Sequence, residues 1–135
     1  MKTAVIYWSG TGNTEAMAKA VAEGAGAEPF SVSDFPGSVE EYDAVAFGCP
    51  AMGAEVLEED EFEPFFSAIE GSLNGKKVAL FGSYGWGDGE WMRSWEERVK
   101  ADGAVLVNGE GVIANETPSD DDLENCRQLG KALSE

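Results

Sequence analysis

The chain has 135 residues, of which 43% are hydrophobic, and this suits a single domain (1–135) with a sizeable core. Its 26 acidic and 9 basic residues give a net charge of −17. We therefore expect no nucleic acid and no anionic membrane as a partner, and we expect protein partners with basic surfaces. Because the chain has no histidine, His-based triads, His metal sites and imidazole acid–base catalysis are excluded.

The two cysteines, Cys49 and Cys126, are too few for a metal cluster. A disulfide between them is possible, but reduced, buried thiols are the favoured interpretation. The N-terminal segment has the pattern of a strand rather than of a signal peptide, and no apolar run is long enough to span a bilayer. We expect a monomeric, cytoplasmic protein.

Apolar runs alternate with helical patterns along the chain. The runs predict strands over 2–8, 28–34, 44–48 and 77–83, and a last strand interrupted between 104–107 and 111–113. Helical spacing predicts helices over 13–23, 38–42, 62–73, 91–99 and 120–133, with Gly24 and Gly26 ending the first of them.

This alternation predicts an α/β fold with three layers, namely a doubly wound, five-stranded parallel sheet of order 2-1-3-4-5 between two layers of helices. In such a fold, ligands bind at the carboxyl ends of strands one, three and four.

The loop after the first strand is Ser9-Gly10-Thr11-Gly12-Asn13-Thr14. Its two glycines, three hydroxyls and one amide at the start of a helix indicate a phosphate site built from uncharged donors. It is not a dinucleotide fingerprint, because Glu15 stands in place of the third glycine, and it lacks the Gly-Lys pair of a P-loop. A plain tight turn is the alternative.

The loops after the third and fourth strands, Gly48–Glu55 and Gly82–Gly89, are also rich in glycine. Each carries one large polarizable side chain, Met52 or Trp86, and together these could enclose a flat ring system. Core packing is the alternative for Met52, whereas flanking glycines place Trp86 at an exposed loop tip.

Glu55 could accept a hydrogen bond from a ring N–H, and Gly53 supplies a turn position where a positive φ costs little. The other aromatic residues near these loops are expected to be structural: Trp8, Tyr84, Trp91 and Trp95. A phosphate site, a stacking surface and a ring-edge acceptor together describe a site for flavin mononucleotide (FMN).

Three segments of the chain resemble the short-chain flavodoxins of the clostridial type: Tyr7–Thr14, Gly48–Gly53 and Phe81–Gly87. The resemblance extends over essentially the whole chain. It implies a low-potential one-electron carrier with non-covalently bound FMN, which shuttles between semiquinone and hydroquinone to serve redox partner enzymes. It also implies that the protein turns over no substrate of its own and has no catalytic residues.

The resemblance further implies that Ser9–Thr14 hold the phosphate, that Met52 and Trp86 flank the isoalloxazine, and that Glu55 faces the flavin N3–H. The full set of cofactor-binding residues that it implies is Ser9, Gly10, Thr11, Gly12, Asn13, Thr14, Pro50, Ala51, Met52, Gly53, Ala54, Glu55, Ser83, Tyr84, Gly85, Trp86 and Gly87.

Two positions depart from the family pattern. Pro50 stands where many relatives carry a Ser or Thr that donates to the phosphate, so one donor is lost, at about 0.5–1.5 kcal/mol. Ala54 stands where some relatives carry Asp or Gly. Because a type II′ turn needs glycine only at its first central position, Gly53–Ala54 can still form it. The resemblance implies that this peptide flips on reduction and turns its carbonyl toward the flavin N5–H.

Six of the nine residues from Glu55 to Glu63 are acidic: Glu55, Glu58, Glu59, Asp60, Glu61 and Glu63. A solvated helix start is one explanation, since helix N-termini favour carboxylates. The other is an acidic rim that steers basic redox partners and disfavours the anionic flavin hydroquinone.

Three other functions, a reductase, a signalling receiver domain and a phosphatase, fit the sequence less well. An FMN-dependent reductase acting on a quinone or nicotinamide would need a substrate pocket over the flavin, for which so short a chain offers no lid. A signalling receiver domain would need an acidic pair after the first strand, and a Cys-x5-Arg phosphatase would need arginine where Glu55 stands. The electron carrier is the favoured interpretation.

Overall fold

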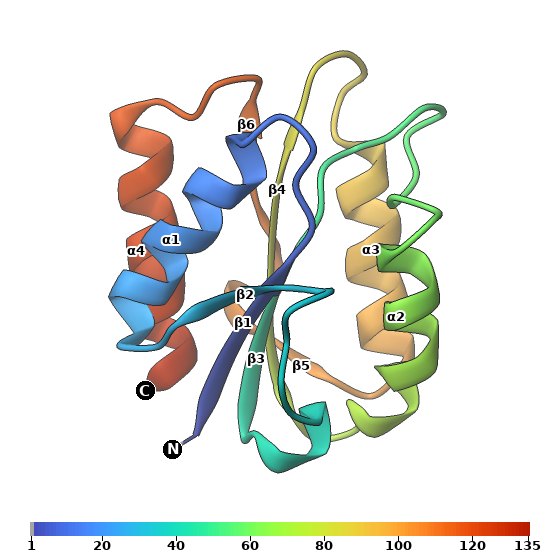
Figure 1. The fold of residues 1–135 in the computed structure, drawn as a ribbon, viewed down its shortest axis with the longest axis vertical. Helices are drawn as coiled ribbons and strands as arrows, with labels where there is room; N and C mark the ends of the chain where they lie inside the picture. The colour runs from blue at the N-terminus through green and yellow to red at the C-terminus, as the bar shows by residue number, and fades with distance from the viewer. Residues whose placement is uncertain (1) are drawn as a thin grey trace.

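The computed structural model describes residues 2–135 (Figure 1). All strand pairs of its sheet are parallel, and the strand order is β2-β1-β3-β4-β5, with β6 also paired to β4. The strands are β1 (Thr3–Tyr7), β2 (Pro29–Ser31), β3 (Ala44–Gly48), β4 (Lys77–Tyr84), β5 (Val105–Leu106) and β6 (Val112–Asn115).

The predicted order 2-1-3-4-5 and the interruption of the last strand are confirmed. β5 pairs with the start of β4 at Lys77–Val78, and β6 pairs with its end at Phe81–Tyr84. The two segments therefore share the fifth position of the sheet, and a short 3-10 turn at Val107–Gly109 separates them.

Four α-helices cover the sheet, α1 and α4 on one face and α2 and α3 on the other (Figure 1). They are α1 (Asn13–Ala25), α2 (Phe62–Ile69), α3 (Glu90–Ala101) and α4 (Asp120–Ser134). Two more 3-10 turns complete the chain, at Val39–Glu41 and Glu70–Ser72. The predicted three-layer α/β architecture is confirmed.

Residues alternate between the two faces of the sheet, as the pleat of a strand requires. In β3, Val45 and Phe47 belong to the core beneath α2 and α3, whereas Ala44 and Ala46 belong to the core beneath α1 and α4. Both thiols are free and buried, as expected for Cys49 and Cys126.

The expectation that Gly24 ends the first helix is wrong. The helix continues to Ala25 and is capped by Gly26, whose φ is 66°. A side chain at Gly24 would collide with the carbonyl of Arg127, and one at Gly130 would collide with the carbonyl of Val21. These glycines therefore allow α1 and α4 to approach closely.

The carboxyl ends of β1, β3 and β4 lie at the same edge of the sheet, where the loops to α1, α2 and α3 emerge at the top of Figure 1. No helix within residues 2–135 combines the length and the apolar character needed to cross a bilayer.

Candidate functional site

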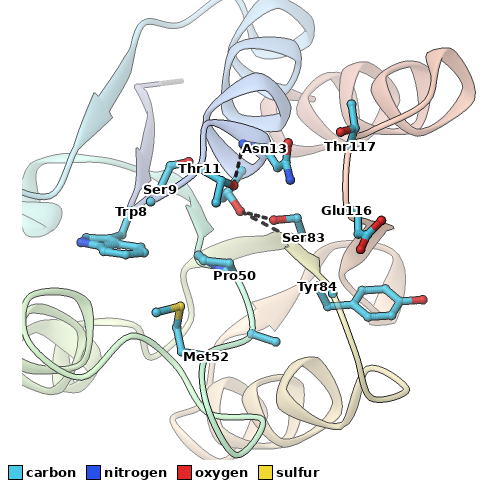
Figure 2. Close-up of a pocket in the computed structure, with 14 residues that line it drawn as sticks. Trp8, Ser9, Thr11, Asn13, Pro50, Met52, Ser83, Tyr84, Glu116 and Thr117 are labelled. Carbon is cyan, nitrogen blue, oxygen red and sulfur yellow. Dashed lines mark hydrogen bonds between the residues drawn. The ribbon is translucent and has the colours of Figure 1, made fainter.

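A cavity of about 480 Å³ lies at this edge, within the size range of small-molecule sites (Figure 2). It is formed by the three loops predicted to meet there and by the segment that follows β6. Its lining residues are Trp8, Ser9, Gly10, Thr11, Asn13, Thr14, Pro50, Ala51, Met52, Ser83, Tyr84, Gly85, Glu116 and Thr117.

The hydroxyls of the first loop stabilise its backbone. The Ser9 Oγ accepts a hydrogen bond from the Gly12 N–H at 3.1 Å, and the Thr11 Oγ1 accepts one from the Asn13 N–H at 3.5 Å. Gly12 has a φ of 97°, which favours glycine at this position before the helix. Because both hydroxyls act as acceptors toward the loop, their hydrogens stay available to donate into the cavity.

A buried hydroxyl pair joins α1 to the end of β4. The Oγ atoms of Thr14 and Ser83 lie 2.9 Å apart, and the Ser83 N–H donates to the Thr14 Oγ1 at 3.3 Å. Both residues line the cavity, and Ser83 is labelled in Figure 2. Whichever hydroxyl donates within the pair, the hydrogen of the other remains, so the pair offers one donor to a ligand.

The lining carries no Lys or Arg and includes the carboxylate of Glu116. A bound anion would thus depend on hydroxyl and backbone N–H donors at the start of α1, where the helix dipole is favourable. In α1 the N–H groups of Thr14 and Glu15 lie in the first turn, which has no acceptor within the helix. This donor set suits a phosphate.

The second loop is a tight hairpin. Met52 and Val56 exchange two backbone hydrogen bonds, at 2.8 and 3.0 Å. They enclose three residues, one more than the two-residue turn expected at Gly53–Ala54. The extra residue, Glu55, adopts a φ of 60°, and Gly53 has a φ of 48°.

Glu55 offers one free acceptor atom. Its Oε2 accepts a hydrogen bond from the Trp91 N–H at 2.9 Å, whereas its Oε1 is buried and has no partner within residues 2–135. A buried acceptor without a donor is costly, and a ring N–H would satisfy it. A side chain at Gly87, whose φ is 88°, would collide with this carboxylate, so the third loop needs glycine there.

The third loop presents Trp86, which is 67% exposed, as expected for a loop tip. Met52, on the second loop, is 37% exposed. Tyr84 packs against Trp91 at a ring distance of 5.6 Å. The indoles of Trp91 and Trp95 are buried on α3, which confirms their structural role.

The cavity brings together eleven of the seventeen predicted cofactor-binding residues. Six others lie on the same loops but outside its lining: Gly12, Gly53, Ala54, Glu55, Trp86 and Gly87. Three lining residues were not predicted to bind the cofactor: Trp8, Glu116 and Thr117. Trp8 and Tyr84, expected to be structural, contact the core and also line the cavity.

A signal for Glu116 and Thr117 exists in the sequence. They follow the second half of the interrupted last strand, and β6 pairs with the end of β4 through Tyr84 and Asn115. The Glu116 N–H also donates to the Tyr84 carbonyl at 2.7 Å. The carboxyl end of the fifth strand therefore lies beside that of the fourth, and its loop reaches the same cavity.

Glu58 belongs neither to a solvated helix start nor to an exposed acidic rim, because it is only 5% exposed. Its carboxylate accepts hydrogen bonds from the backbone N–H groups of Asp60, Glu61 and Phe62 at 2.9, 2.7 and 2.8 Å. Burial favours a raised pKa for Glu58, but these donors hold the pKa below its ordinary value. Glu58 thus caps the start of α2.

Glu63 is likewise held within the fold. Arg98 binds both of its carboxylate oxygens at 2.8 and 2.7 Å and lowers its pKa. Arg98 also binds Glu70 and lies 4.9 Å from the ring of Phe66. Glu58 and Glu63 are therefore engaged within the fold, and of these two carboxylates only Glu63 is paired with a cation.

Comparison with known proteins agrees with this geometry. The family model for flavodoxin matches residues 5–130. The chain is 46% identical to the flavodoxin of Clostridium beijerinckii, over 96% of this chain and 97% of the relative. It is also 46% identical to the flavodoxin of Megasphaera elsdenii, over 96% of each chain.

A solved structure supports the same relation. The solution structure of two-electron reduced Megasphaera elsdenii flavodoxin aligns with a TM-score of 0.84 at 45% identity, over 98% of each chain. The chain therefore belongs to the flavodoxin family, as a short-chain member, and is an FMN-based electron carrier.

Proposed function

We propose that the cavity at the carboxyl ends of β1, β3 and β4 is the site at which this chain binds FMN. The observation that carries the proposal is the lining itself, which combines hydroxyl and N–H donors at the start of α1 with a side chain that can flank a ring, Met52. FMN, when bound, supplies the redox chemistry, because its isoalloxazine takes up and releases electrons.

The chain's own residues bind and orient the cofactor. Ser9–Thr14 and Ser83 hold the phosphate with uncharged donors, while Pro50, Ala51, Tyr84 and Gly85 complete the walls. Met52 and Trp86 cover the two faces of the ring and limit the access of water.

Glu55 accepts the ring N3–H with its free oxygen, and Gly87 leaves room for this carboxylate. Gly53 has a φ of 48°, which glycine adopts at little cost, and the space around its Cα is open, since a Cβ there would meet no atom within 4 Å. The reorientation of this peptide on reduction remains a prediction.

We also propose that the protein turns over no substrate of its own and acts as one domain, 1–135, in monomeric form. Its redox partners dock transiently over the cavity with basic surfaces, because exposed carboxylates such as Glu59 and Asp60 lie on the loop beside it. The free thiols of Cys49 and Cys126 suit a reducing compartment such as the cytoplasm.

Reconstitution tests this proposal. Apoprotein mixed with FMN should turn yellow, quench the flavin fluorescence and take up electrons in separate one-electron steps during anaerobic reduction by dithionite. The loaded protein alone should not oxidise NADH or NADPH and should not reduce a quinone with them. A protein that stays colourless contradicts the site, and steady oxidation of nicotinamide without a partner favours the reductase.

A further inference from the structure

We propose that Glu61 is a positioning residue that fixes the Trp8 indole as a wall of the cofactor cavity. Through this hydrogen bond the acidic segment would support the phosphate-binding loop, and this role is separate from the effect of its charge. The inference rests on the proposed function, because it assigns a role toward the same cavity.

Trp8 stands at the entrance of the phosphate-binding loop. It follows β1 directly, and its N–H donates to the Gly48 carbonyl at 3.0 Å, so its backbone is fixed to the neighbouring strand. A Cβ added at Gly10 would lie 3.1 and 3.3 Å from two atoms of the Trp8 ring. The indole therefore lies against the backbone of Gly10, and its orientation limits the shape of the loop. Figure 2 shows the ring beside Ser9, at the margin of the cavity.

The indole has one polar atom, and it is bound by a residue from a distant part of the chain. The Trp8 Nε1 donates to the Glu61 Oε1 at 3.1 Å, across 53 residues of sequence. Because indole N–H is a donor only and the side chain has just two rotatable angles, one directed acceptor is enough to select a ring orientation.

Glu61 is itself held in place. Its N–H donates to the Glu58 Oε1 at 2.7 Å, and its carbonyl accepts the Phe65 N–H at 3.2 Å. Glu58 is anchored in turn, since its N–H donates to the Cys49 Sγ at 3.3 Å. The backbone that carries the acceptor for the indole thus belongs to a fixed turn.

The neighbouring residue Glu59 provides a matched control. It is exposed like Glu61, carries the same charge and lies two positions away, but its carboxylate accepts no hydrogen bond within residues 2–135. Substitutions at these two positions can therefore distinguish an effect of the Glu61 hydrogen bond from an effect of charge. Glu61→Gln removes the charge and keeps an acceptor oxygen, Glu61→Ala removes both, and Glu59→Gln removes a charge alone.

The dissociation constant for FMN, measured by quenching of flavin fluorescence, tests the proposal. We expect Glu61→Gln to match Glu59→Gln, and we expect Glu61→Ala to bind FMN about 2- to 10-fold more weakly than either, the loss expected for one hydrogen bond. In a Trp8→Phe background, where no indole N–H exists, Glu61→Ala should have no further effect. The Trp8 Nε1–H resonance should shift in Glu61→Ala and much less in Glu61→Gln.

Two results would overturn the proposal. Equal FMN affinities for Glu61→Ala, Glu61→Gln and Glu59→Gln would show that only charge matters. If the loss of FMN affinity in Trp8→Phe/Glu61→Ala equalled the product of the losses in the two single variants, the two residues would act independently. Thermal unfolding of each variant controls for loss of fold. If the unmodified protein bound no FMN, the proposed function itself would fail, and that outcome is distinct from both of these.

Discussion

Two adjoining loops at the same edge of the sheet differ in the charge of their side chains. Ser9–Thr14 gathers donors without a single cationic side chain, and Thr14 is its most buried member. Glu55–Glu63 gathers six carboxylates in nine residues. The donors of the first loop suit a negatively charged ligand, whereas the second loop places carboxylates near that ligand. The hydrogen bonds from the first loop therefore have to outweigh the repulsion from these carboxylates.

Composition overstates how many carboxylates of the acidic segment are free of contacts within the protein. Four of its carboxylates are engaged within the protein and two are not. Glu55 accepts from a backbone N–H, Glu58 caps α2, Glu61 accepts from Trp8 and Glu63 pairs with Arg98, whereas Glu59 and Asp60 face solvent. Substitutions in the two loops should therefore have effects of very different size.

The largest effect is expected at the buried hydroxyl pair. Thr14→Val removes a donor from the cavity and leaves the Ser83 N–H without its acceptor. FMN binding should weaken about 10- to 100-fold, and the free energy of unfolding should fall by about 1–3 kcal/mol. Flavin fluorescence titration and denaturant unfolding measure the two quantities.

Thr3→Val is the matched control, because the Thr3 Oγ1 is buried and has no partner within residues 2–135. Its replacement by a methyl group should leave stability unchanged or raise it. An unchanged FMN affinity in Thr14→Val would contradict the assignment of this hydroxyl to the phosphate site.

The next effect concerns the cap of α2. Glu58→Ala leaves three backbone N–H groups without an acceptor and should lower the free energy of unfolding by about 1–3 kcal/mol. Glu59→Ala, in the adjacent exposed position, should change it by less than about 0.5 kcal/mol. If both variants lost the same free energy of unfolding, Glu58 would not act as a cap of α2.

The same carboxylate gives a dependence on pH. Because the pKa of Glu58 is lower in the folded than in the unfolded protein, its stabilisation is complete above the unfolded value, about 4.3. It is lost as the pH falls through the lower, folded value. Denaturant unfolding of Glu58→Gln should therefore show a weaker loss of stability toward acid than Glu59→Gln does. Parallel curves for these two variants would argue against the cap.

The smallest effect is expected from the free charges. Glu59→Gln and Asp60→Asn should each raise the potential for formation of fully reduced flavin by about 20 mV, the value for a unit charge at about 10 Å in water. The shift should shrink as salt is added, because these side chains are exposed. Potentiometric titration at two ionic strengths checks both points, and a shift that salt leaves intact would point to a structural cause.

The fold and the position of the site could be predicted from the sequence, because both depend on pattern. Uninterrupted apolar runs mark buried parallel strands, and strand order decides which loops meet. The role of a side chain depends on the residues that it contacts, and these are often distant in the sequence. Glu58 and Glu59 are the same residue type in adjacent positions, and only the fold directs one of them to the start of α2.

Long-range contacts explain the other differences. Gly24 has the sequence character of a helix end, but it serves the approach of α4, about 100 residues away in the chain. Trp8 has the appearance of a core residue, and its partner Glu61 becomes visible only when two loops are placed side by side. Glu116 reaches the cavity because β6 pairs with the end of β4, a contact between distant parts of the chain.

The central claim is that uncharged donors at the start of α1 bind the phosphate of FMN. Parallel titration of the apoprotein with FMN and with riboflavin, which lacks the phosphate, tests it most directly. We predict that FMN binds about 100-fold more tightly or better, since several hydrogen bonds are at stake, and that the preference survives high salt because no cation lines the cavity. Equal affinities for the two flavins would contradict the account.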